Sequence, residues 1–148
     1  METLKLKPFQ PSDQQEVKQL ILAGLVEHWG FLDETKNPDL DDIATSYAGA
    51  TFLVGRLGTR IVGTGALVPR SNETTEIVRM SVAKELRQHG IGRQILQALL
   101  AQAQAQGFRQ VILETTASWE EVVTFYLRCG FQITHYLDGD VYFARDIA

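Results

Sequence analysis

Cysteine and clustered histidine are scarce in this sequence. Cys129 is the single cysteine among 148 residues, so no disulfide can form within the chain and a cysteine-based metal cluster is excluded. His28, His89 and His135 lie far apart, in no spacing that is typical of metal ligands. We therefore expect no metal site.

Basic runs and long apolar runs are also missing. The formal net charge is −4 and no cluster of Lys or Arg forms a basic stripe, so a nucleic-acid partner is not expected. The longest apolar stretch, residues 20–26, is too short to span a bilayer. The first ten residues contain no apolar signal core, which favours a cytoplasmic location without a membrane partner.

The composition is that of an ordinary globular protein. Hydrophobic residues make up 45% and charged residues 22%, and the length suits a single domain over residues 1–148. Periodicity predicts four helices and a larger number of strands in mixed order, which indicates a mixed α/β (α+β) fold. The expected strands are 3–7, 51–57, 60–68, 76–82, 110–115, 131–137 and 141–145, and the expected helices follow Ser12, begin at Asn37-Pro38, and cover 90–106 and 119–129.

The expected helix starts differ in their capping residues. Ser12 with Gln15, and Ser118 with Glu121, each have the spacing of a capping box. Residues 27–36 are expected to form a loop after the first helix. The helix over 90–106 has no Ser, Thr, Asp or Asn at its start, so its first N–H groups need another partner.

Two glycines stand at that uncapped helix start. Gly90 and Gly92 would let an anion approach the free N–H groups, where the helix dipole adds positive charge. Arg87 and Arg93 flank the turn and could bind phosphate oxygens. The pattern favours a pyrophosphate ligand, although a glycine turn without a ligand has the same local signature.

A second motif follows the next strand. Arg87-x-x-Gly90-x-Gly92, followed by Phe125-Tyr126 and then Gly130-Phe131, resembles the GNAT superfamily of N-acetyltransferases. The resemblance implies a mixed central sheet of about seven strands, splayed in a V and flanked by about four helices. It also implies that acetyl-CoA lies in the V, between strands 76–82 and 110–115, and that a homodimer is possible.

The resemblance also implies where acetyl-CoA is bound. Gln88 stands where the family commonly has glycine, and Trp119 stands where it often has asparagine, so this chain departs from the family at two contact positions. The backbone of residues 80–82 is expected to pair with the pantetheine arm. The full set of expected cofactor contacts is Met80, Ser81, Val82, Arg87, Gln88, His89, Gly90, Ile91, Gly92, Arg93, Trp119, Phe125 and Tyr126.

Acetylation of an amine needs a base for the amine and an acid for the departing thiolate. The family places the tyrosine of this motif beside the CoA sulfur, so Tyr126 is the candidate acid, with a core tyrosine as the alternative. Glu76 is the candidate base, directly or through a water; the alternative is a glutamate that pairs with Arg79 or is solvated. Weaker candidate bases are Glu34, Glu73 and Glu114.

The sequence thus predicts an acyl-CoA-dependent N-acetyltransferase that acts by direct transfer in a ternary complex. A small-molecule primary amine is favoured as acceptor because no recognition domain is apparent. Peptide or protein amines remain an alternative, and so does a catalytically silent acyl-CoA-binding module. Acceptor contacts are expected from Trp29, Phe31, Glu34 and Tyr136, in segments whose acidic and aromatic residues suit a cationic amine.

Overall fold

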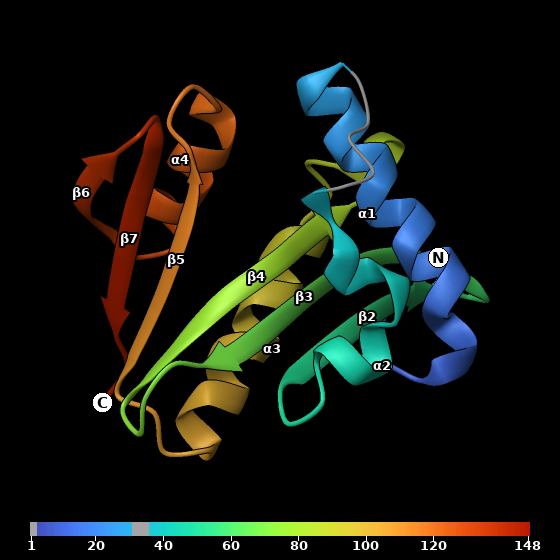
Figure 1. The fold of residues 1–148 in the computed structure, drawn as a ribbon, viewed down its shortest axis with the longest axis horizontal. Helices are drawn as coiled ribbons and strands as arrows, with labels where there is room; N and C mark the ends of the chain where they lie inside the picture. The colour runs from blue at the N-terminus through green and yellow to red at the C-terminus, as the bar shows by residue number, and fades with distance from the viewer. Residues whose placement is uncertain (1–2, 31–35) are drawn as a thin grey trace.

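A seven-stranded mixed sheet forms the centre of the computed structural model, which describes residues 3–30 and 36–148 (Figure 1). The strand order is β1-β2-β3-β4-β5-β7-β6. Neighbouring strands run antiparallel except β4 and β5, which run parallel. The strands are β1 Lys5–Pro8, β2 Thr51–Leu57, β3 Arg60–Pro69, β4 Thr74–Val82, β5 Gln110–Thr116, β6 Gln132–Leu137 and β7 Asp140–Asp146.

Helices cover both faces of the sheet. Figure 1 shows α3 behind β3 and β4, with α1 and α2 in front of them. Two apolar cores result: Ile95 and Leu99 of α3 belong to the first, and Val17 and Ile21 of α1 to the second. The α-helices are α1 Gln14–Trp29, α2 Ile43–Ser46, α3 Ile91–Ala105 and α4 Glu120–Arg128, and the 3-10 turns are η1 Pro11–Asp13, η3 Pro38–Asp41 and η4 Lys84–Leu86.

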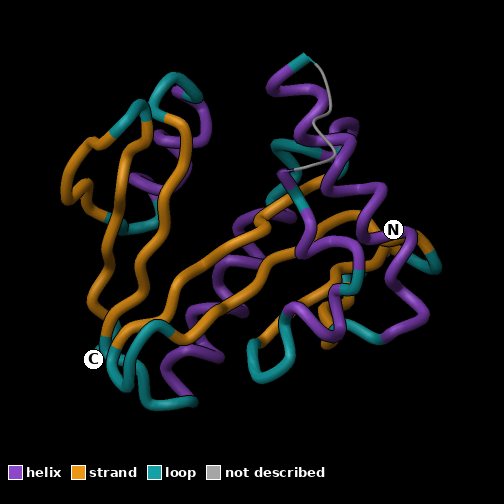
Figure 2. Tube along the Cα trace, viewed as in Figure 1, coloured by secondary structure: helices purple, strands orange, loops and turns teal. Residues whose placement is uncertain are grey.

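The sheet opens between β4 and β5. The two strands pair over three positions only, from Thr74 opposite Gln110 to Glu76 opposite Ile112. Beyond these positions they diverge, and the two parts of the molecule form the arms of a V (Figure 2). The predicted splayed α/β fold is therefore confirmed.

A bulge interrupts β4 at the start of the opening. The pairing of β3 with β4 shifts register between Thr64 and Ala66, and Arg79 on the opposite strand has a φ of 55°. The Thr64 hydroxyl donates a hydrogen bond to the Arg79 carbonyl over 2.8 Å, which holds the irregular segment. Bulges bend strands and free backbone groups from the ladder, so β4 turns away from β5 here.

Three local predictions were wrong. The expected box of Ser12 and Gln15 does not form: the capping box lies at the start of η1, where the Gln10 N–H donates to the Asp13 carboxylate over 3.0 Å, and α1 begins after Asp13 without a side-chain cap. Helix α4 begins after Trp119 without a side-chain cap from Ser118. Helix α1 continues to Trp29, into the expected loop, and ends where Gly30 has a φ of 76°.

Candidate active site

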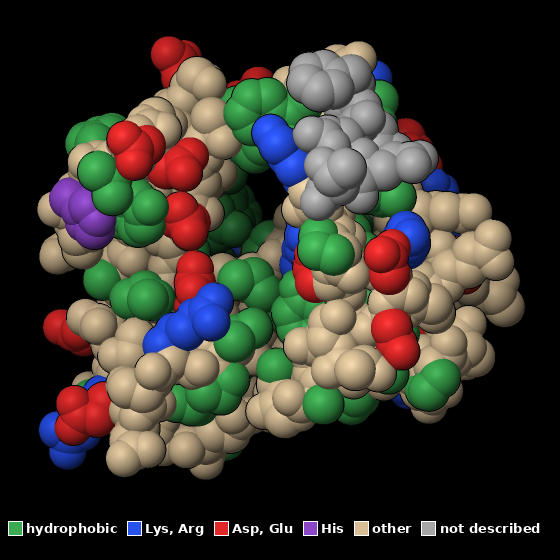
Figure 3. Space-filling model, viewed as in Figure 1, with side chains coloured by type: hydrophobic (Ala, Val, Ile, Leu, Met, Phe, Trp, Pro, Cys, Tyr) green, Lys and Arg blue, Asp and Glu red, His purple; other side chains and the backbone are tan. Residues whose placement is uncertain are grey.

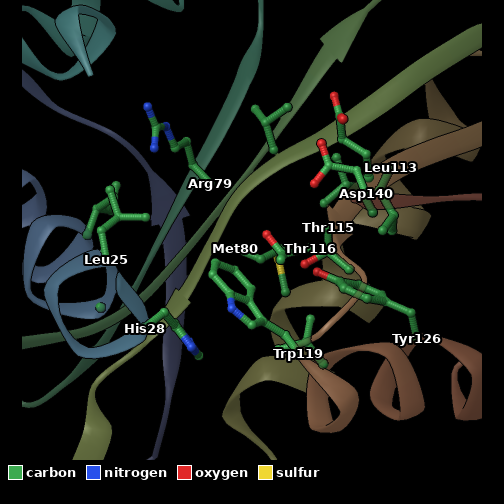
Figure 4. Close-up of a pocket in the computed structure, with 16 residues that line it drawn as sticks. Leu25, His28, Arg79, Met80, Leu113, Thr115, Thr116, Trp119, Tyr126 and Asp140 are labelled. Carbon is green, nitrogen blue, oxygen red and sulfur yellow. The ribbon is translucent and has the colours of Figure 1, made fainter. Parts of the chain in front are cut away.

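A cavity of about 360 Å³ lies in the opening of the V, with residues from both arms around it (Figure 4). One wall comes from α1 and β4, and the other from β5, the start of α4 and the start of β7. The lining residues are Ile21, Gly24, Leu25, His28, Ile77, Val78, Arg79, Met80, Leu113, Glu114, Thr115, Thr116, Trp119, Val122, Tyr126 and Asp140.

Tyr126 places a buried phenol at this cavity. Its side chain is 6% exposed, and its ring packs against Phe131 and Phe143 with centroid distances of 5.8 Å. Its hydroxyl forms no hydrogen bond with the described residues, and it is not one of their fully enclosed polar atoms without a partner, so it opens onto the cavity. Burial raises the pKa of Tyr126 well above its usual range, and Cys129 adds to the shift. The phenol is therefore a neutral donor with an open position on the cavity side (Figure 4).

Trp119 reaches across the opening from the start of α4. Its indole stacks on His28 of α1, with ring centroids 4.2 Å apart, and Trp29 lies 5.5 Å away at a tilt. Trp119 and His28 both line the cavity. An asparagine at this position could not make such a stack, so the departure from the family pattern joins the two arms of the V by aromatic contact.

The glycine turn leads into α3 as the sequence predicts. Gly90 is the N-cap, with a φ of 83° and no side chain capping it. The first helical bond runs from the Gln94 N–H to the Gly90 carbonyl, so the N–H groups between them have no helical acceptor. Gln88 takes the left-handed conformation, φ 65°, although it lacks the freedom of the glycine common in the family. That conformation costs a non-glycine residue about 1–2 kcal/mol.

Arg87 is engaged by another side chain. Its guanidinium forms an ion pair with Glu27 of α1 over 2.5 Å and donates to the Val82 carbonyl over 3.3 Å. The hydrogen bond from Arg87 holds the pKa of Glu27 below its ordinary value, against a small opposing effect of burial. A phosphate at the turn would therefore compete with Glu27 for this guanidinium.

Glu76 lies at the closed end of the V. It accepts a hydrogen bond from the Arg70 Nε over 2.7 Å, and its side chain is 15% exposed. It is not among the cavity-lining residues. The expected alternative of a pair with Arg79 is wrong, because Arg79 binds Asp39 instead, over 2.6 Å.

Arg79 belongs to a network that sequence reasoning missed. Its guanidinium contacts Asp39 twice, over 2.6 and 3.0 Å, and Asn37 over 3.1 Å, while the Tyr47 hydroxyl donates to Asp39 over 2.5 Å. Burial opposes the ionisation of Asp39, but hydrogen bonds from Arg79 and Tyr47 outweigh it and keep the pKa of Asp39 low. Burial, together with the bond to Asp39, raises the pKa of Tyr47 to about 12. The contacts of Arg79 join residues about forty positions apart, and no sequence pattern predicts contacts at that distance along the chain.

The predicted site residues fall into three groups. Met80, Trp119 and Tyr126 line the cavity, whereas the other expected cofactor contacts lie along β4, in the glycine turn or beside Tyr126. Trp29 lies at a tilt against Trp119 without lining the cavity, and Tyr136 is 65% exposed on β6, also outside the lining. Phe31 and Glu34 lie outside the described residues. His28 and Arg79 were missed as lining residues, whereas Asp140 lies in the final hairpin that the sequence predicts as a wall of the acceptor site.

Comparison with known proteins identifies the family. The model of the acetyltransferase (GNAT) family matches residues 15–131. N-acetyltransferase 8 of Rattus norvegicus is 34% identical over 122 residues, which are 76% of this chain and 54% of that protein. The chain therefore belongs to the GNAT acetyltransferase family, and it spans about half the length of the curated relatives it matches.

Solved structures share the whole fold. A GNAT-family acetyltransferase from Staphylococcus aureus Mu50 has a TM-score of 0.86 at 23% identity, covering 97% of this chain and 99% of that one. PaiA N-acetyltransferase from Thermoplasma acidophilum, solved with coenzyme A, has a TM-score of 0.86 at 16% identity, covering 98% and 99%. The TM-scores and the coverage show that the fold is shared.

Two further observations concern the described residues. Within residues 3–30 and 36–148, no group of three or more His, Cys, Asp and Glu side chains is placed to hold a metal ion. The helices in the same part of the chain are too short or too polar to cross a membrane.

Proposed function

We propose that this protein transfers the acetyl group of acetyl-CoA to a primary amine, directly and within a ternary complex. The observation that carries the proposal is the phenol of Tyr126, buried, neutral and without a described protein partner, at the cavity where β4 and β5 separate. A GNAT relative solved with coenzyme A supports the choice of donor. A small-molecule amine is the proposed acceptor.

The donor would bind along β4 and at the start of α3. The bulge and the separation from β5 free backbone groups of residues 80–82, which could pair with the amides of pantetheine. The uncapped N–H groups after Gly90 suit the pyrophosphate. Arg87 would leave Glu27 to bind a phosphate oxygen.

The chemistry moves two protons. The amine nitrogen attacks the thioester carbonyl, a C–N bond forms and the C–S bond breaks, and the sulfur leaves as a thiolate. The Tyr126 hydroxyl would donate its proton to that thiolate as the C–S bond breaks, since burial keeps the phenol in its protonated form. The amine proton would leave to Glu76 through a water, since Glu76 does not line the cavity.

Tyr126→Phe tests this proposal. The substitution keeps the ring and its packing on Phe131 and Phe143, so the fold and the affinity for acetyl-CoA should be retained. We expect single-turnover acetyl transfer to slow roughly 10-fold or more, with a water replacing part of the acid's role. Equal transfer rates in parent and variant would refute the acid role and leave Tyr126 as a core residue.

The same assay addresses the catalytically silent alternative. Acetyl-CoA binding by calorimetry without thiol release, across a panel of primary amines, would indicate a binding module. Acetyl transfer to any member of the panel would identify an enzyme.

A further inference from the structure

The strand register places two carboxylates on one face of the β5–β7 arm. Glu114 lies opposite Tyr142, and Thr116 lies opposite Asp140. Because alternate residues of a strand share a face, these four side chains point to the same side of the sheet. Glu114, Thr116 and Asp140 all line the cavity, on the face of the arm opposite to the one on which Tyr126 packs, so the acidic pair and Tyr126 border the same cavity from the two faces of the arm.

These carboxylates have no basic partner in the part of the chain that the structure describes. Neither Glu114 nor Asp140 forms an ion pair there. The two carboxylates affect the neighbouring Tyr142. Its pKa is raised, first by a hydrogen bond to Glu114, then by burial and by the negative charges of Glu114, Asp140 and Asp138. Figure 3 shows acidic side chains gathered along this arm, facing the hollow of the V.

On the opposite wall, among the described residues that line the cavity, the one Lys or Arg side chain is already paired, and His28 is stacked on Trp119. Arg79 lines the cavity, but its guanidinium is bound twice by Asp39 and once by Asn37. Its charge is therefore balanced on the β4 side. The side chains of β5 and β7 thus give their wall of the cavity a negative charge, whereas the charges on the β4 wall cancel.

Tyr126 provides an independent sign that a ligand occupies the same cavity. Its side chain is more than nine-tenths buried, and its hydroxyl has no hydrogen-bond partner among the described residues and faces the cavity that Asp140 also lines (Figure 4). The amine that reacts there must be neutral, so it cannot be the group that balances the two carboxylates. A second cationic group on the same acceptor can do so.

We propose, on the basis of the acetyl transfer proposed above, that Glu114 and Asp140 form a cation subsite and that the acceptor is an aliphatic diamine. One amine of the acceptor reacts beside Tyr126, while the other stays protonated between the two carboxylates. The subsite selects the acceptor by charge and takes no part in proton transfer.

Acceptors matched in length test the subsite. We compare 1,5-diaminopentane, 1-aminopentane and 5-aminopentanoate, which end in a cation, a methyl group and an anion. Because the ion pairs would be partly exposed, we expect kcat/KM for the diamine to exceed that for the monoamine roughly 5- to 30-fold. Added salt should lower this ratio, since salt screens exposed charges. The anionic compound should be the poorest acceptor.

Variants assign the preference to the two carboxylates. In Glu114→Gln/Asp140→Asn the ratio of diamine to monoamine should fall to near 1. The control Glu121→Gln/Asp146→Asn makes the same charge change at exposed positions outside the cavity and should keep the parent ratio. An unchanged ratio in the first variant, or a loss of turnover with the monoamine as large as with the diamine, would overturn the subsite.

The outcomes also separate this inference from the proposed reaction. Turnover of the monoamine without preference for the diamine refutes the subsite alone. Absence of turnover with every amine refutes the reaction. In that case calorimetry of 1,5-diaminopentane with the parent and both double variants decides the subsite: binding lost only in Glu114→Gln/Asp140→Asn supports it, and equal or absent binding overturns it.

Discussion

Gly65 of β3 lies where β3 faces the bulge of β4 and helix α3. A Cβ atom at this position would lie 2.7 Å from the Met80 Sδ, 2.8 Å from the Leu99 Cδ1 and 2.9 Å from the Ile95 Cγ2. Real Cβ contacts are longer than these, so Gly65→Ala must displace three side chains at once. The backbone of Gly65 does not have a positive φ, so the effect is one of packing and not of backbone strain.

The size of the effect follows from two opposing contributions. Overpacking of a dense core destabilises by about 1–3 kcal/mol. Replacing glycine by alanine restricts the unfolded chain and recovers about 0.4–1 kcal/mol. The expected net loss is about 1–2 kcal/mol, or roughly 3–8 °C in Tm for a domain of this size. Because Met80 lines the cavity, its displacement should also weaken acetyl-CoA binding.

Urea and thermal unfolding measure the stability, and calorimetry measures the binding. Gly24→Ala in α1 is the matched control, since its Cβ would lie an ordinary 3.5 Å from the Ser81 Oγ. Alanine in a helix interior should stabilise that variant by about 0.5–1 kcal/mol. If Gly65→Ala were as stable as Gly24→Ala, the close packing of β3 on α3 and the bulge would be refuted.

Three more predictions concern charged groups. Glu27→Gln should strengthen acetyl-CoA binding a few-fold by freeing Arg87, and weaker binding in calorimetry would instead mean that Glu27 orients Arg87 for the phosphate. Asp39 has a lowered pKa, so its contribution is present above the unfolded pKa of about 3.9 and is lost as pH falls through the folded value. Asp39→Asn should therefore cost about 1–3 kcal/mol at pH 7 in urea unfolding and flatten the loss of stability below about pH 4; a parallel pH curve would contradict this. Glu76→Gln should lower turnover and flatten the acidic limb of the pH–rate profile with acetyl-CoA affinity unchanged, whereas an unaltered profile would leave Glu76 as the partner of Arg70.

Much of the fold could be predicted from the sequence because the signals are local. The strands β2 and β3 and the amphipathic α3 were predicted to within about two residues, from strand composition and helical periodicity. The helix starts were predicted less well. Capping depends on which of several neighbouring polar groups forms the hydrogen bond, and before α1 the box forms between Gln10 and Asp13 instead of Ser12 and Gln15.

The candidate site divides in the same way. The glycine turn and Tyr126 belong to short motifs, so their residues could be named in advance. The position of Glu76 outside the cavity, the capture of Arg87 by Glu27 and the stacking of Trp119 on His28 depend on elements far apart in the chain.

The sequence by itself determined the order of the helices and most of the strands, the uncapped glycine turn before α3 and the tyrosine of α4, because spacing within a few residues specifies each of them. Only the tertiary structure decided where β4 leaves β5 and which charges remain unbalanced inside the V. A side chain's partner is set by packing across the sheet: Arg79 is balanced by Asp39, forty positions away, while Glu114 and Asp140 face the cavity without a basic partner among the described residues.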